Sequence, residues 1–295
     1  MNKIFLTGGS GFVGQSVKTY FGSLIHELDL RNNVLVKLDG NVIFHFAGKS
    51  HDLKNISDVR EYYKVNTDLT KKVYDAFLAS HSKVFITLSS VKAVADQVAG
   101  ELTEEHSPEP VTHYGKSKLL AEQYIFSQPI PKSKRVYVLR PCMIHGEGNK
   151  GNLNLLYKIV SKNIPWPLGA FENSRSFCSI DNLMFIFKEL IEREDIPSGI
   201  YNVADDEPLS TNELIGLIAQ SQNRKPKIWK ISRALIENIA KIGDKLHLPL
   251  NSERLHKLTS SYVVSNAKFK AVIGKPLPVS SREGLLKTFK SFNSK

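Results

Sequence analysis

The side chains in this sequence with the clearest capacity for chemistry are the phenol of Tyr114 and the ammonium of Lys118, in the stretch Tyr-Gly-Lys-Ser-Lys. Four residues apart on a helix, they share one face. A phenol with its ordinary pKa of ~10 is a poor base at neutral pH unless a cation stabilises its ionised form. Lys118 can supply that cation. About one such pattern is expected by chance in a chain with ten tyrosines, and Tyr114 would then be a half-buried helix residue and Lys118 a solvated one.

The hydroxyl of Ser90 precedes this pair in the chain. It follows an apolar run, residues 84–88, which predicts a buried strand ending in two serines. Transfer of a hydride to a carbonyl leaves an alkoxide that needs a proton, and a serine at a strand end can hydrogen-bond and orient that oxygen. A strand that ends in serine is followed by a helix that carries tyrosine and lysine. This order predicts that Ser90, Tyr114 and Lys118 form a catalytic group.

A glycine-rich stretch near the N-terminus predicts where a dinucleotide would bind. An apolar strand, residues 4–6, leads into Gly8, Gly11 and Gly14, and apolar residues at helical spacing follow from Phe12. The free N–H groups of such a helix N-terminus bind a pyrophosphate, and glycine spacing lets the backbone approach it. We therefore predict cofactor contacts at Gly8, Gly11, Phe12 and Val13, with Tyr114 and Lys118 at the nicotinamide ribose.

Strands and helices alternate through the first half of the chain. Predicted strands cover residues 4–6, 23–30, 41–48, 83–90 and 135–140, and predicted helices lie at 12–21, 66–80 and 112–126. This alternation is typical of an α/β fold with a Rossmann-type, doubly wound parallel sheet. Ligands bind beyond the carboxyl ends of such strands, so Gly8, Ala47, Ser90 and Pro141 should line one crevice.

Beyond residue 147 the pattern becomes irregular, with a proline-broken segment and short strands. We expect residues 1–147 to form the dinucleotide-binding domain, with elements around 176–195 returning to it. Residues 148–175 and 196–295 should form a smaller, mixed α/β substrate-binding lobe that closes over the crevice.

Composition restricts the class of protein. The 295 residues are 41% hydrophobic without an apolar run of the ~18–20 residues that span a membrane, and the two cysteines, far apart in sequence, suit a cytoplasmic protein. His51 and His145, near strand ends, have no carboxylate or cysteine at metal-ligand spacing, so we assign no metal. The net charge is +11, and residues 223–295 carry 16 Lys and Arg against 4 Asp and Glu. We interpret this scattered charge as solvated helix faces, with no specific nucleic-acid partner and only weak, salt-sensitive binding to anionic vesicles.

Taken together, these motifs resemble the extended short-chain dehydrogenase/reductases, the NAD(P)-dependent family of sugar-nucleotide epimerases, dehydratases and reductases. The resemblance covers nearly the whole chain, and its matching stretches are 7–14, 42–48, 65–67, 88–92, 114–118, 139–141, 151–153, 165–169, 175–182, 201–203 and 254–288. It implies that Ser90, Tyr114 and Lys118 are a catalytic triad. It further implies cofactor or supporting roles for Ala47, Gly48 and Asn66, and substrate contacts, including those to the nucleotide phosphates, at Ser90, Asn152, Leu153 and Arg175.

Departures from the family pattern bear on cofactor and reaction. Asp29 would favour NAD through the ribose hydroxyls, whereas Arg31 would favour NADP through a 2′-phosphate, and the sequence leaves both open. No Thr-Asp-Glu triplet stands at residues 89–91, which disfavours a 4,6-dehydratase. The chain resembles most the branch that reduces UDP-linked 4-keto sugars. We therefore expect a reductase of a nucleoside-diphosphate 4-keto-hexose, with a 4-epimerase or a non-catalytic dinucleotide-binding regulator as alternatives, and leave a homodimer open.

Overall fold

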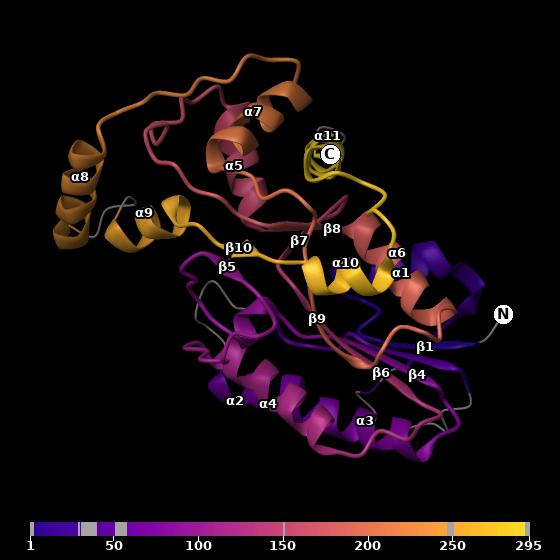
Figure 1. Cartoon of the computed structure of the whole chain (residues 1–295). Coiled ribbons are helices and arrows are strands. Elements are labelled where there is room, and N and C mark those ends of the chain that lie inside the picture. The colour runs from indigo at the N-terminus through magenta and orange to yellow at the C-terminus, as the bar shows by residue number, and fades with distance from the viewer. Residues whose placement is uncertain are drawn as a thin grey trace. The chain divides into compact units, whose positions relative to one another are not determined.

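A six-stranded parallel sheet forms the centre of the fold. The computed structural model describes residues 3–28, 30, 40–50, 58–149, 151–246 and 251–292. Every pairing in this sheet is parallel. In spatial order its strands are β2 (Ile25–Glu27), β1 (Ile4–Thr7), β3 (Val42–His45), β4 (Val84–Leu88), β6 (Arg135–Pro141) and β9 (Gly199–Val203). Figure 1 labels β1, β4, β6 and β9 among them. The order reverses direction between β1 and β3, which makes a topological switch point there. The predicted Rossmann-type fold is confirmed.

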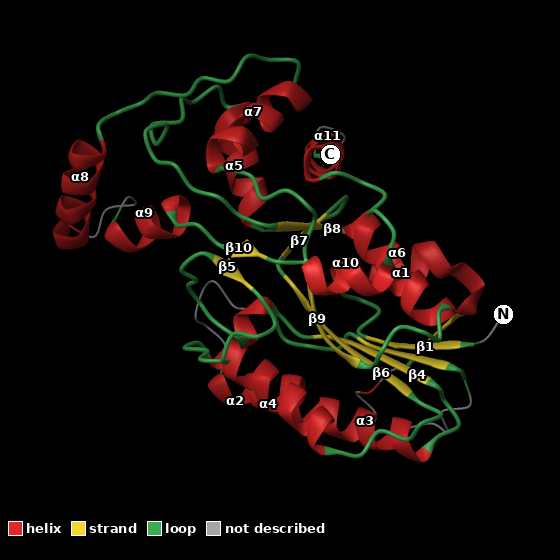
Figure 2. Ribbon diagram, viewed as in Figure 1, coloured by secondary structure: helices red, strands yellow, loops and turns green. Residues whose placement is uncertain are grey.

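Helices cover both faces of this sheet, which explains why its strands are almost continuously apolar. Figure 2 shows α2 (Val59–Tyr62), α3 (Leu69–Ala79) and α4 (His113–Ser127) on one face, and α1 (Phe12–Phe21), α6 (Ile180–Glu192) and α10 (Ala267–Ile273) on the other. Side chains alternate between the two layers. Phe85 packs in the cluster with Phe77 of α3, whereas Phe44 contacts Phe21 of α1 and Phe187 of α6, with ring centroids 5.7 and 5.1 Å apart.

Two compact units divide the chain. The first comprises Met1–Cys142, Asn182–Ala204 and Ser265–Pro278, and the second comprises Met143–Asp181, Asp205–Val264 and Val279–Lys295. This division differs from the expected one, in which all of residues 196–295 belonged to the smaller lobe. β9 lies in the first unit because it hydrogen-bonds along β6, and α10 lies there too, with Phe269 packed 5.6 Å from the Tyr201 ring of β9.

Helices dominate the second unit, and one hydrophobic cluster connects most of them. Their apolar faces meet around Trp166, Phe177 and Phe289. The remaining elements of the chain are β5 (Glu101–Leu102), β7 (Met143–His145), α5 (Asn152–Ser161), β8 (Phe177–Ser179), α7 (Thr211–Ser221), α8 (Arg233–Leu246), α9 (Ser252–Thr259), β10 (Val263–Val264) and α11 (Ser281–Ser291). β7 and β8 pair in parallel within this unit.

Candidate active site

Close backbone packing makes glycine necessary in the loop between β1 and α1. Gly8 has φ +76°, and a Cβ at this position would lie 2.5 Å from the backbone nitrogen of Ala47. A Cβ on Gly14 would lie 2.3 Å from the carbonyl oxygen of Gly8. α1 begins after Gly11 without a side-chain cap, so the first-turn N–H groups, those of Phe12 and Val13 among them, have no capping side chain. This arrangement fits a pyrophosphate at the helix N-terminus.

An acidic side chain lies beside this loop, at a position that the sequence analysis did not select. Asp29 and Arg31 lie outside the described residues, whereas β2 ends two residues earlier, at Glu27. The Glu27 carboxylate is 2.3 Å from where a Cβ on Gly9 would lie, and it accepts a hydrogen bond from Lys18 at 3.1 Å. A carboxylate at this strand end fits the ribose hydroxyls of an adenosine. The sequence predicts a strand that runs on to Asp29, and Glu27 was therefore not selected.

Ser90 and Tyr114 lie in contact. Ser90 is 8% exposed, and its Oγ accepts a hydrogen bond from the backbone N–H of Lys92 as it caps a short 3₁₀ turn, Val91–Ala93. Burial raises the pKa of Tyr114, and a hydrogen bond from the Ser90 side chain opposes that shift. α4 itself starts where Thr112 accepts from the N–H of Gly115, which places Tyr114 in the first turn facing the end of β4. Burial therefore keeps the phenol protonated, and the hydrogen bond from Ser90 orients it.

The ammonium group of Lys118 lies one turn further along α4. It donates to the carbonyl oxygen of Leu88 at 2.9 Å, and a Cβ on Gly48 would be only 3.1 Å from its Nζ. Burial lowers the pKa of Lys118 to about 8, and the charge of Glu122 opposes that shift. Because this pKa is above neutrality, Lys118 remains mostly protonated at neutral pH. A cation therefore lies one helical turn from Tyr114, where the sequence interpretation expects one.

Asn66 joins the loop after β3 to α4. It is fully buried in a π-helical turn, Tyr63–Asp68, a geometry that often occurs at functional sites. Its side chain accepts from the N–H of Lys49 at 2.8 Å and donates to the carbonyl of Lys49 and the hydroxyl of Ser117, both at 3.0 Å. Asn66 and Lys118 therefore both lie beside Gly48, with the Asn66 Oδ1 and the Lys118 Nζ 3.2 and 3.1 Å from where a Cβ on that glycine would be.

A buried polar chain supports these groups from inside the sheet. The hydroxyl of Thr70 donates to the carbonyl of Asn66, so the Nε2 of His45, 2.9 Å away, must donate to Thr70. The Nδ1 of His45 then accepts from the hydroxyl of Thr7 at 2.8 Å. Burial, followed by the charge of Lys118, lowers the pKa of His45 to about 3. His45 is consequently neutral and links β1 and β3 to the turn that holds Asn66.

Two further charged residues belong to the site and were missed by the sequence analysis. Glu122 lies on α4 one turn beyond Lys118 and two turns beyond Tyr114. Its carboxylate accepts from the Arg140 Nε of β6 at 3.0 Å and from the hydroxyl of Ser89, the residue before Ser90. Both members of the ion pair are buried, with side chains 3% and 4% exposed. A signal existed in the spacing Tyr-x-x-x-Lys-x-x-x-Glu, since all three side chains share one helix face.

Three predicted substrate residues lie in the second unit. Arg175 donates to the carbonyl and hydroxyl oxygens of Ser260 at 3.1 and 3.3 Å, and its backbone bridges Leu209 and Tyr262. Burial lowers the pKa of Arg175, and within the described ranges no carboxylate forms an ion pair with it. Asn152 begins α5, whereas the Leu153 side chain lies in the hydrophobic cluster, which leaves only its backbone available.

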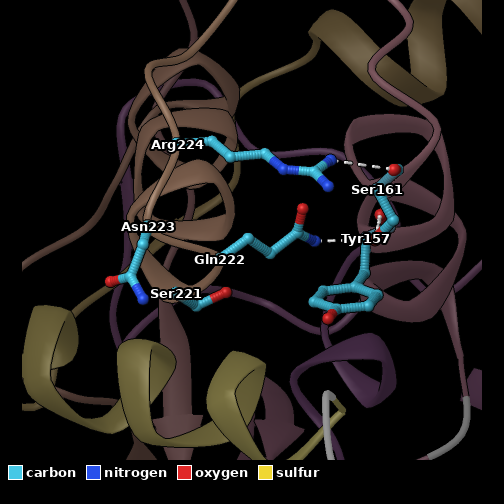
Figure 3. A pocket seen from close by; sticks show the side chains of 6 residues that line it. All are labelled: Tyr157, Ser161, Ser221, Gln222, Asn223 and Arg224. Carbon is cyan, nitrogen blue, oxygen red and sulfur yellow. Dashed lines mark hydrogen bonds between the residues drawn. The ribbon is translucent and has the colours of Figure 1, made fainter.

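A separate pocket of about 350 Å³ lies between the C-terminal ends of α5 and α7 (Figure 3). Its polar side chains largely satisfy one another, because Gln222 donates to the Ser161 hydroxyl at 2.6 Å and Arg224 to the Ser161 carbonyl at 3.1 Å. None of the predicted site residues lines it. In the described part of the chain, no group of three or more His, Cys, Asp or Glu side chains could hold a metal.

Fold and site together define a Rossmann-type enzyme that uses a nicotinamide dinucleotide. Residues 23–204 match the NAD dependent epimerase/dehydratase family, and the chain belongs to that family, as predicted. It is 26% identical to a UDP-glucose 4-epimerase of Vibrio cholerae over 98% of this chain and 95% of that protein. It is 25% identical to a GDP-6-deoxy-D-mannose reductase of Pseudomonas aeruginosa, over 74% of this chain and 79% of that one. The structure of MoeE5 in complex with UDP-glucuronic acid and NAD shares the fold, with a TM-score of 0.75, 18% identity and 99% of each chain covered.

Proposed function

We propose that this enzyme reduces the C4 keto group of a nucleoside-diphosphate 4-keto-hexose, with UDP as the nucleotide carrier. The observation that carries the proposal is the contact between Ser90 and Tyr114, with the Lys118 ammonium one helical turn away. A protonated phenol beside a serine hydroxyl is the pair of groups that a carbonyl oxygen needs as it becomes an alkoxide. Because its pKa is raised, Tyr114 keeps its proton at neutral pH and can donate it when the carbonyl is reduced.

The residues around the glycine loop would hold the dinucleotide. The backbone N–H groups of Phe12 and Val13 would bind its pyrophosphate, and Lys118, near Gly48, would bind its nicotinamide ribose. The dinucleotide supplies the hydride. Glu27, at the end of β2, supports NAD rather than NADP, because a carboxylate accepts hydrogen bonds from a ribose but repels a 2′-phosphate.

Ser90, Tyr114 and Lys118 would each have a part in the transfer of a proton to the substrate oxygen. Ser90 would donate a hydrogen bond to the substrate oxygen, which orients it toward the phenol. Tyr114 would release its proton to that oxygen, and the positive charge of Lys118 would stabilise the phenolate that remains. Glu122 and Arg140 would hold α4 against the ends of β4 and β6 so that these distances are kept.

The second unit would recognise the diphosphate. Arg175 supports this assignment because, within the described residues, its guanidinium donates to the neutral carbonyl and hydroxyl oxygens of Ser260, so its charge is available for an anion. The start of α5, with Asn152 and the backbone of Leu153, would add donors of a helix N-terminus.

A nucleoside-diphosphate-hexose 4-epimerase is the second candidate. Two observations favour it: the Vibrio cholerae UDP-glucose 4-epimerase aligns over almost all of both chains, and Glu27 suits NAD. A non-catalytic dinucleotide-binding role is disfavoured, since Ser90, Tyr114 and Lys118 are all present in the site.

A cofactor-resolved assay tests the proposal. The purified enzyme is given UDP- and dTDP-linked 4-keto-hexoses with NADH or NADPH, and in parallel UDP-glucose with no added dinucleotide. A reductase oxidises one reduced dinucleotide for each sugar formed. Interconversion of UDP-glucose and its C4 epimer without net oxidation of a dinucleotide would instead identify the enzyme as a 4-epimerase.

A further inference from the structure

α8 exposes an apolar surface that the catalytic site does not use. Of its 14 residues only Ile236, Ala240 and Gly243 are buried. Figure 1 shows the helix beside α9 at the periphery of the second unit. In the part of the chain that the structure describes, no helix is long and apolar enough to cross a membrane, so any role of α8 at a membrane is at its surface.

The exposed apolar residues form one continuous stripe. Leu235, Ile239, Ile242 and Leu246 are 53%, 41%, 53% and 64% exposed. Their spacing of four, three and four residues confines them to roughly 60° of the helix circumference, because successive residues are about 100° apart. The buried residues lie on a separate face. α8 therefore has two apolar faces, one that packs against its own unit and one in contact with solvent.

Charge around the stripe is distributed unevenly. The segment from Arg224 to Leu246 holds seven Lys and Arg but only two Asp and Glu. By helical geometry the two acids, Glu237 and Asp244, lie opposite the stripe, whereas Lys245 lies about 90° and Lys241 about 130° from its middle, both nearer to the stripe than the acids are. An approaching anionic surface would meet the lysines and the apolar residues before the carboxylates.

The segment before α8 adds an aromatic side chain. Trp229 is 57% exposed, although its backbone is fixed by hydrogen bonds to Trp166 and Gly169. Lys227 and Lys230 flank it and are exposed as well. Exposed tryptophan beside basic residues and an apolar helical stripe is the composition that binds in the interface of an anionic bilayer.

We propose that the exposed face of α8, together with Trp229, docks the enzyme on the surface of an anionic membrane. The apolar stripe inserts at the level of the headgroups, and Lys245, Lys227 and Lys230, all exposed, contact lipid phosphates. A second copy of this chain is a poorer occupant, because pairing two such faces would bring two basic segments together. The charges alone predict binding that is lost at physiological ionic strength, whereas a stripe buried in lipid should keep part of the binding there.

Vesicle co-sedimentation of the full-length enzyme tests this inference. The vesicles are phosphatidylcholine alone or mixed with phosphatidylglycerol, each at low and physiological ionic strength. Leu246→Gln is compared with Leu155→Gln, because Leu155 on α5 is similarly exposed, at 60%. A variant with Gln at all four stripe positions and a Lys241→Gln/Lys245→Gln variant complete the set. Circular dichroism and turnover of a soluble sugar nucleotide verify that each variant is folded and active.

We expect binding to mixed vesicles that persists at physiological ionic strength. The four-position variant should bind at least ~10-fold more weakly, and each lysine lost should cost roughly fivefold. Leu155→Gln should bind like the wild type. Of the two tryptophans only Trp229 is exposed, so wild-type fluorescence should shift to the blue on binding and Trp229→Phe should lose the shift.

Three results would overturn the proposal. The first is no binding to mixed vesicles at physiological ionic strength, and the second is binding that the four-position variant leaves unchanged. The third is a protein-concentration-dependent dimer that the same variant abolishes, which would assign the face to a second copy. None of these depends on which sugar the enzyme converts.

Discussion

The substitution Glu122→Gln separates the positioning role of the buried ion pair from that of the catalytic residues. It preserves shape but removes the carboxylate that pairs with Arg140 and accepts from Ser89. Since both side chains of the pair are nearly inaccessible to solvent, the remaining arginine is left buried without its partner. Loss of one member of such a pair costs about 3–5 kcal/mol of folding free energy.

The same substitution should change the proton affinity of Lys118. The Glu122 carboxylate raises the pKa of Lys118, so removing it lowers that pKa further from about 8. At the ~5–6 Å expected for helix neighbours and an effective dielectric constant of about 20, two unit charges interact by roughly 3 kcal/mol. The corresponding shift is at most about 2 pH units.

The assay is the pH dependence of kcat/KM for carbonyl reduction. Lysine loses its charge above its pKa, so wild-type activity should fall as pH rises through about 8. In Glu122→Gln that fall should begin ~1–2 units lower. The double variant Glu122→Gln/Arg140→Gln removes both charges and should recover much of the stability. Its alkaline limb should stay shifted, because the carboxylate that raises the pKa of Lys118 is still absent. A Glu122→Gln enzyme whose alkaline limb stays at the wild-type position would refute the reasoning, even if its kcat were reduced.

Three other substitutions test individual groups. Tyr114→Phe should bind dinucleotide nearly normally, as measured by fluorescence titration, but turn over ~10²–10⁴-fold more slowly, and activity within a few-fold of wild type would remove Tyr114 from the mechanism. Arg175→Ala should raise KM ~10–100-fold, because a charged hydrogen bond to phosphate is lost, whereas a lower Tm with normal KM would make its bonds to Ser260 its main role. Glu27→Ser should weaken NAD binding and improve NADP binding, and an unchanged preference would place the adenosine ribose elsewhere.

The parts of this site that the sequence predicts are those set by local geometry. The glycines before α1 are required by one tight turn, and Tyr114 and Lys118 share a face through helical spacing alone. Asn66 was expected near the site from the family resemblance, and the structure adds the π-helical turn that fixes it.

Other features depend on long-range contacts that leave little local signal. The Glu122–Arg140 pair joins a helix to a strand through tertiary packing, and β9 belongs to the sheet only because it pairs with β6. Amphipathic spacing in α8 predicts a helix, but it cannot tell which of two apolar faces is buried. The end of β2 at Glu27 was missed because a three-residue strand has too few positions to define its boundary.

Hydride transfer to the sugar is the most direct test of the account. The wild-type enzyme and Tyr114→Phe are incubated with a UDP-linked 4-keto-hexose and NADH or NADPH carrying deuterium at the transferable position, and the product is examined by NMR. We predict one deuterium at C4 of the sugar for each dinucleotide oxidised by the wild type, and almost none with the variant. A product without deuterium at C4 would contradict hydride transfer to that carbon, and equal labelling by the two enzymes would contradict the role of Tyr114.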